Sequence, residues 1–144
     1  MGEMSSPEDH RTHEGGNEMR ELMVELQHIG IPTTDMEATK AFYEKLGFEI
    51  AFETINDGAR VIFFRFGNIT LETYESADAA HKVGAIDHLA ITVTDIEAAY
   101  DWICKAGLNT MDDSIHFLPF WEKGVRFFTI MGPNAEKVEF SQYL

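Results

Sequence analysis

The pattern of apolar and polar positions changes in the same way twice along the chain. An alternating stretch over residues 24–31 runs into Thr34 and Asp35, and a second one over residues 85–93 runs into Thr94 and Asp95. Alternation with a period of two predicts a strand, and an Asp followed by a Glu in the first turn is typical of a helix N-terminus. The pattern therefore predicts a strand followed by a helix in both halves.

Each predicted helix is amphipathic and is followed by a glycine, Gly47 or Gly107, where a C-terminal cap is expected. In the first half three further strands are expected over residues 48–55, 60–66 and 69–75, separated by the turn signals Asp57-Gly58 and Gly67-Asn68. The order is βαβββ. In the second half, residues 112–124 lack a regular pattern and are expected to form a loop.

The two halves also resemble each other in sequence. The stretch QHIGIPTTDMEA, from Gln27, aligns with DHLAITVTDIEA, from Asp87, without a gap. We therefore predict an α+β chain of two tandem modules, residues 23–82 and 83–144. Residues 1–22 contain few apolar side chains and are expected to form a flexible acidic tail.

Composition narrows the choice of partners. With 25 acidic and 11 basic residues the formal charge is −14, which disfavours binding to nucleic acids and to anionic membrane surfaces. No apolar run is long enough for a membrane helix. Cys104 is the single cysteine, so no internal disulfide is possible and a reduced, cytoplasmic setting is expected. A small-molecule substrate is the expected partner.

Candidate chemistry lies on the strand face that points away from the predicted helices. The alternation places His28 and His88 on this face of the two first strands, and Glu72 and Glu139 on the same face of the two last strands. If the modules associate as pseudo-symmetric halves, these four side chains can converge. Two imidazoles and two carboxylates suit Zn²⁺, Ni²⁺, Co²⁺, Mn²⁺ or Fe²⁺.

Several motifs carry a family resemblance: HIGIPTTDMEATKAFYEKLGF, ITLETYE, DHLAITVTDIEAA and GPNAEKVEF. The chain resembles the vicinal oxygen chelate superfamily of glyoxalases, bleomycin resistance proteins and extradiol dioxygenases. The resemblance implies two βαβββ modules forming a curved mixed sheet that cups a divalent metal, with the helices outside. The positions that match the family's metal ligands are His28, Glu72, His88 and Glu139. The turn at residues 133–136 departs from the family form because no glycine follows Asn134.

The resemblance leaves three reaction classes open. In a glyoxalase-type lyase or isomerase, Zn or Ni would hold two adjacent substrate oxygens and stabilise an enediolate, with Glu139 or Glu72 as the catalytic base. An Fe²⁺ extradiol dioxygenase would use His28, His88 and Glu139, while Glu72 as a fourth ligand argues against it. A metal-free ligand-binding protein of the bleomycin-resistance kind is the third class, and the complete ligand set argues against that.

Other residues bear on the substrate. An aromatic lid is one interpretation of the irregular region, and a core plug or an oligomer contact is the other. Tyr74 and Arg126 are further candidate substrate contacts. Pro32 and Ser76 stand where the resemblance to glyoxalase I would place an Arg and an Asn for glutathione, so glutathione is not the expected substrate. The residues of the aromatic lid interpretation are His116, Phe117, Phe120 and Trp121.

A homodimer is expected. The site is closed either within one chain or by modules of two chains.

Overall fold

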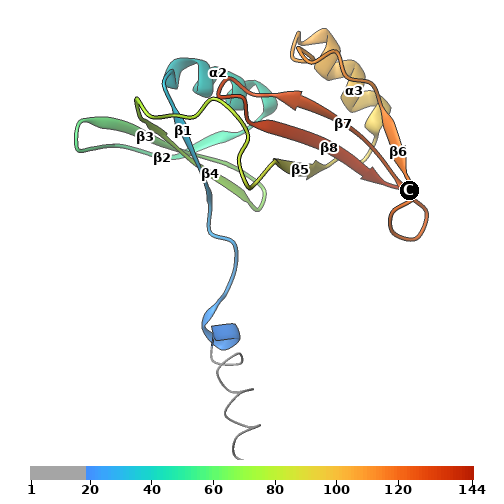
Figure 1. Ribbon diagram of the computed structural model, residues 1–144, viewed down its shortest axis with the longest axis horizontal. Coiled ribbons are helices and arrows are strands. Elements are labelled where there is room, and N and C mark those ends of the chain that lie inside the picture. The colour runs from blue at the N-terminus through green and yellow to red at the C-terminus, as the bar shows by residue number, and fades with distance from the viewer. Residues whose placement is uncertain (1–18) are drawn as a thin grey trace, which may run out of the picture.

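The computed structural model describes residues 19–144, which form two four-stranded mixed sheets, each with one helix (Figure 1). The α+β class predicted from the sequence is confirmed. Most of the predicted acidic tail, residues 1–18, lies outside the described residues. In the described part of the chain no helix is long and apolar enough to span a membrane.

The first sheet has the strand order β1-β4-β3-β2, and the second has the order β5-β8-β7-β6. In each sheet the first and last strands pair in parallel, as β1 with β4 and β5 with β8, and the other neighbours are antiparallel. The modules thus share one topology, as the repeat predicts, but they form two sheets rather than one continuous sheet. The elements are β1 (Ile29–Thr33), α2 (Met36–Leu46), β2 (Glu49–Asn56), β3 (Ala59–Phe66), β4 (Ile69–Glu75), β5 (His88–Thr92), α3 (Ile96–Lys105), β6 (His116–Leu118), β7 (Val125–Met131) and β8 (Lys137–Tyr143).

Three predicted boundaries need correction. The strand predicted over residues 85–93 is the shorter β5, which begins at His88 and ends at Thr92. The first strand begins at Ile29 rather than at residue 24, because the ladder with β4 begins at the Ile29–Leu71 pair. In that register residues 24–26 lie beyond Ile69, the first residue of β4. The region 112–124 is not wholly irregular, since β6 pairs with β7. A three-residue strand is too short for its alternation to stand out in the sequence.

The helix ends follow the predicted caps. Asp35 accepts a hydrogen bond from the backbone N–H of Ala38 at 3.0 Å, and Asp95 does the same for Ala98 at 3.1 Å. Gly47 ends α2 with φ = 106°, a conformation that a side chain would disfavour. Equivalent caps give the two helices the same start relative to their first strands.

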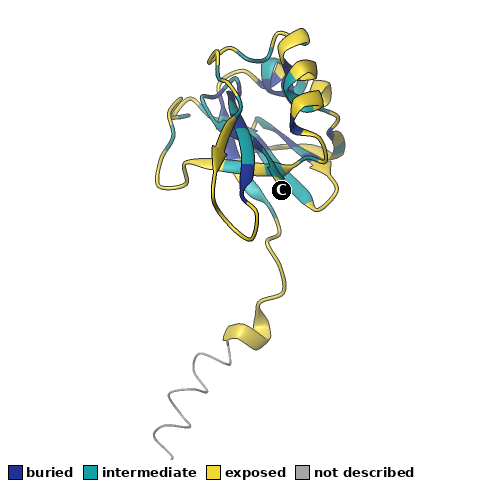
Figure 2. Cartoon of the chain, turned by 90° about the vertical axis from the view of Figure 1, so that its right-hand side faces the viewer, coloured by how far each residue is buried: buried dark blue, intermediate teal, exposed yellow. Residues whose placement is uncertain are grey.

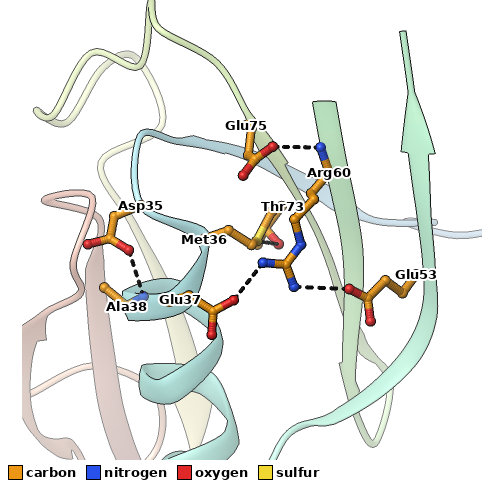
Figure 3. A network of polar contacts seen from close by, with 8 residues as sticks. All are labelled: Asp35, Met36, Glu37, Ala38, Glu53, Arg60, Thr73 and Glu75. Atoms are coloured by element: carbon orange, nitrogen blue, oxygen red, sulfur yellow. Dashed lines mark hydrogen bonds and ion pairs between the residues drawn. The ribbon is translucent and has the colours of Figure 1, made fainter. Parts of the chain in front are cut away.

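Helix α2 is tied to its sheet by Arg60. The guanidinium lies 2.5 Å from Glu37 on α2 and 3.1 Å from Glu53 on β2, and the backbone N–H of Arg60 donates to Glu75 on β4 (Figure 3). The hydrogen bond and the charge of Arg60 lower the pKa of the Glu37 carboxyl. The helix therefore stays on one face of the sheet and leaves the opposite face open.

The modules meet where α2 packs against the turn between β7 and β8. The buried Tyr43 hydroxyl donates to Glu136 at 2.8 Å, and the Asn134 side chain donates to Thr39 at 3.0 Å. Apolar residues of both modules form one buried cluster, and the buried residues lie largely on the strands (Figure 2). The two sheets are therefore held by one shared core.

Candidate metal centre

The structure brings one histidine and one glutamate together in each module. His28 Nε2 lies 3.2 Å from Glu72 Oε1, and His88 Nε2 lies 3.5 Å from Glu139 Oε1. The parallel pairing of first and last strands explains this, because it sets Glu72 opposite Gly30 and Glu139 opposite Ala90. His28 stands two residues before Gly30, and His88 stands two residues before Ala90. Each histidine therefore lies on the same face of its sheet as the glutamate.

The other ring nitrogen of each histidine has an acceptor. His28 Nδ1 lies 2.9 Å from Gln27 Oε1, and His88 Nδ1 lies 2.9 Å from Asp87 Oδ2. A hydrogen on Nδ1 leaves the lone pair on Nε2, which faces the glutamate. Metal-bound histidines typically donate their second N–H in this way, which fixes the tautomer and the ring orientation.

Asp87 is itself held as a carboxylate. Hydrogen bonds from His88 and from Lys137 lower the pKa of the Asp87 carboxyl, and the Lys137 ammonium lies 3.3 Å from it. An ionised Asp87 accepts the Nδ1 hydrogen more strongly than a neutral amide does. The second module therefore orients its histidine through a charged partner, and the first through Gln27.

The spacing within each pair fits two ligands of one divalent metal ion. Two ligands bound at about 2.0–2.2 Å to one metal lie about 3.0–3.5 Å apart, which matches both nitrogen-to-oxygen distances. With the hydrogen on Nδ1, the Nε2 lone pair and the carboxylate oxygen would both be available as donors to one ion. Nitrogen and oxygen donors of this kind are those that Zn²⁺ and its neighbours prefer.

The predicted convergence of all four ligands is not seen within one chain. Over residues 19–144, no group of three or more His, Cys, Asp or Glu side chains is placed to hold a metal ion. Each module instead presents a half-site of two donors, His28 with Glu72 and His88 with Glu139.

The open face of the first module is aromatic. His28 packs edge-on against Phe63 with ring centroids 5.6 Å apart, and Phe52 lies beside Phe63 at 6.2 Å. Phe63 pairs directly with Glu72 across β3 and β4. Tyr74, the predicted substrate contact, is half-buried two residues beyond Glu72, and its ring lies close to Gly30.

The open face of the second module is polar. A cavity of about 290 Å³ is lined by His88 and Glu139 together with Asp113, His116 and Thr129. His116, from the predicted lid, therefore shares a cavity with the second half-site. Asp113 was not among the predicted site residues, and no repeat marks it.

The other predicted lid residues and the candidate substrate contact Arg126 lie elsewhere. Arg126 pairs with Glu97 of α3 at 3.0 Å, on the helix side of the sheet, and Phe117 is its strand partner. Phe120 and Trp121 are exposed in the loop before β7, and neither lines the 290 Å³ cavity. The structure thus brings one residue of the aromatic loop to the second half-site and leaves the others outside it.

The acceptors Gln27 and Asp87 were also missed as site residues, although a signal existed. Both stand directly before the repeated histidine, so the repeat could have shown them.

Comparison with known proteins identifies relatives along most of the chain. Residues 25–116 match the family model of the Glyoxalase/Bleomycin resistance protein/Dioxygenase superfamily. The uncharacterized protein YwbC of Bacillus subtilis is 30% identical over 131 residues, covering 81% of this chain and 96% of YwbC. A second uncharacterized protein of that organism, YwkD, is 28% identical over 116 residues, covering 74% of this chain and 89% of YwkD.

Solved structures show the same fold at low sequence identity. A glyoxalase family protein from Enterococcus faecalis superimposes with a TM-score of 0.69 at 23% identity, covering 83% of this chain and 98% of that one. The fosfomycin resistance protein FosX from Listeria monocytogenes, in complex with Mn(II) and sulfate, superimposes with a TM-score of 0.65 at 15% identity. The coverage there is 85% of this chain and 94% of FosX.

Proposed function

Since the chain belongs to the glyoxalase/bleomycin resistance protein/dioxygenase superfamily, we propose that it is a divalent-metal-dependent lyase or isomerase of the glyoxalase type. Its substrate is a small molecule with two oxygens on adjacent carbons. The observation that carries the proposal is the pair of equivalent half-sites, each with Nε2 facing a carboxylate and Nδ1 hydrogen-bonded behind it.

His28, Glu72, His88 and Glu139 are the proposed ligands, and Zn or Ni is the metal we expect from this donor set. When bound, the ion supplies positive charge that binds the two substrate oxygens and stabilises the negative charge that develops on them. Binding of Mn(II) by FosX, which shares the fold, supports a divalent ion.

The chain's own groups would then move the proton. A glutamate that faces the substrate, Glu72 or Glu139, takes a proton from the carbon next to the carbonyl and returns it to the neighbouring carbon. Phe63 packs against His28 and covers one side of the first half-site with apolar surface, which favours exclusion of water from the reacting carbon. The Pro32 and Ser76 positions supply no cation or amide for a glutathione glutamyl group, so we propose a substrate other than a glutathione adduct.

We infer that a second copy of the chain completes the site. The half-sites hold two donors each, whereas a divalent ion of this class takes at least four ligands including water or substrate. A two-fold homodimer in which the first half-site of one copy meets the second half-site of the other supplies four protein ligands twice.

The test is metal analysis of protein purified without chelator or nickel affinity resin. We expect about one equivalent of Zn or Ni per chain, lost in the double variant His28→Ala/His88→Ala and kept in the control His81→Ala. His81 is a suitable control because its ring bonds Thr34 rather than a glutamate.

Activity is then assayed with hemithioacetals of methylglyoxal and small thiols, followed as thioester formation. Turnover by the metal-loaded parent, and none by the double variant, supports the proposal. Iron as the native metal would point to a dioxygenase instead. A parent that takes up no metal on reconstitution would contradict the proposal and leave a ligand-binding protein.

A further inference from the structure

Asp113 and His116 form a hydrogen-bonded pair inside the cavity of the second half-site. His116 Nε2 lies 2.7 Å from Asp113 Oδ1. Across the sheet, His116 is paired with Phe127 and Phe127 with Ser141, so His116 is on the same face as Glu139. With strands about 4.8 Å apart, two strand spacings put His116 roughly 10 Å from the Glu139 strand, room enough for a small substrate between them.

The carboxylate of this pair is fixed from several sides. Asp113 Oδ2 accepts the backbone N–H of Thr129 at 2.8 Å, and the backbone of Asp113 is bonded to Asn109 and to the Tyr100 hydroxyl of α3. Burial opposes ionisation of Asp113, but the hydrogen bonds from His116 and from backbone N–H groups outweigh it and lower the pKa of the carboxyl. The ionised form of Asp113 is therefore favoured, and it accepts hydrogen bonds without donating any.

The imidazole is oriented by the same contact. Because an ionised carboxylate only accepts, the hydrogen lies on Nε2 of His116, and Nδ1 carries the lone pair. The ring packs on Phe127 with centroids 5.5 Å apart, and the side chain is 48% exposed. A carboxylate behind one ring nitrogen stabilises the imidazolium that forms when the other nitrogen takes a proton.

The proposed isomerisation requires two proton shifts. When a hydroxyl and a neighbouring carbonyl exchange places, a carbon-bound proton moves to the next carbon and a hydroxyl proton moves to the other oxygen. The glutamate proposed above accounts for the first shift. Of the two histidines that line the 290 Å³ cavity, His88 is a proposed metal ligand, and His116 is the imidazole that stays available for proton transfer, with the Asp113 carboxylate hydrogen-bonded to its Nε2.

We propose that His116, oriented by Asp113, carries the oxygen-bound proton of this reaction. Nδ1 takes the proton as the substrate O–H bond breaks, and the electron pair of that bond becomes the new C=O bond. The former carbonyl oxygen receives the proton from Nδ1, so the imidazole ends neutral and no proton is gained or lost. The assignment rests on the proposed function, because it needs that reaction to occur at the adjoining half-site.

The experiment compares metal-loaded parent, His116→Ala, His116→Gln and Asp113→Asn, with His81→Gln as the matched control. The probe is the hemithioacetal of methylglyoxal and 2-mercaptoethanol. We expect kcat to fall about 100-fold or more in both His116 variants, with KM and metal content unchanged, and less in Asp113→Asn. The pH profile of kcat should lose one titration in His116→Gln, and added imidazole should restore part of the activity of His116→Ala.

The outcomes separate the two proposals. A parent that turns over the probe, with His116 variants within twofold of it, overturns the role of His116 and leaves the proposed function standing. A metal-loaded parent that converts no hemithioacetal overturns both. Loss of metal in the His116 variants would make the residue a ligand rather than a proton carrier, and loss of activity without imidazole rescue and with an unchanged pH profile would make it structural.

Discussion

At the scale of single residues, the groups behind the histidines matter as much as the ligands. Asp87 holds His88 Nδ1 at 2.9 Å, and its removal frees the ring to turn and to change tautomer. We expect Asp87→Ala to weaken metal binding about 10- to 100-fold while the fold is kept. Competition with a coloured chelator measures this. The control is Asp101→Ala, which removes the same charge from an exposed pair with Lys105 on α3 and should leave affinity unchanged; equal affinities for both variants would contradict the orienting role.

At the scale of elements, the contact between α2 and the β7–β8 turn holds the modules together. Tyr43→Phe removes the hydroxyl that donates to Glu136, leaving a partly buried carboxylate short of one donor. We expect a loss of about 1.5–3 kcal/mol in the free energy of unfolding, measured by urea denaturation near pH 7. The control is Tyr143→Phe, a change at a 60% exposed tyrosine that should have little effect on the free energy of unfolding. An equal loss in both variants would show that the hydrogen bond between Tyr43 and Glu136 does not stabilise the junction.

The same contact has a pH dependence of known sign. Burial, together with the charge and hydrogen bond of Glu136, raises the pKa of Tyr43 well above its ordinary value of 10.0. The folded state therefore keeps the phenol proton after the unfolded chain has lost it. The stabilisation is complete below pH 10.0 and is lost as the pH rises from there towards the raised pKa of the folded state, so Tyr43→Phe should lose less stability than the parent over that alkaline range.

The elements also show what the sequence can and cannot predict. Caps such as Asp35 and the phase of strands are local, so helix starts and the side of the sheet that carries Glu72 and Glu139 follow from the sequence. The pairing of Tyr43 with Glu136 joins residues 93 positions apart and depends on how the modules pack. The turn at residues 133–136, which lacks a glycine after Asn134, also needed the structure. There Ala135 adopts the left-handed conformation, with φ = 64°.

At the scale of the whole molecule, the decisive question is which half-sites face each other. If a second copy completes the site, one metal ion is held by His28 and Glu72 of one copy and by His88 and Glu139 of the other. His28→Ala and His88→Ala would each damage both sites of their own homodimer. A mixed dimer of the two variants would carry one intact site and one that lacks both histidines.

Mixing the inactive variants under subunit-exchange conditions should therefore restore about a quarter of the parent's bound metal and hemithioacetal turnover, because random exchange gives half mixed dimers with half their sites intact. Size-exclusion chromatography with light scattering checks that dimers form, and metal analysis counts the restored sites. The matched control mixes His28→Ala with Glu72→Ala, which damage the same half-site and restore nothing in any mixed dimer. No restoration in the first mixture, with exchange demonstrated, would place all four ligands within one chain, which would then have to close its two sheets around the metal on binding it.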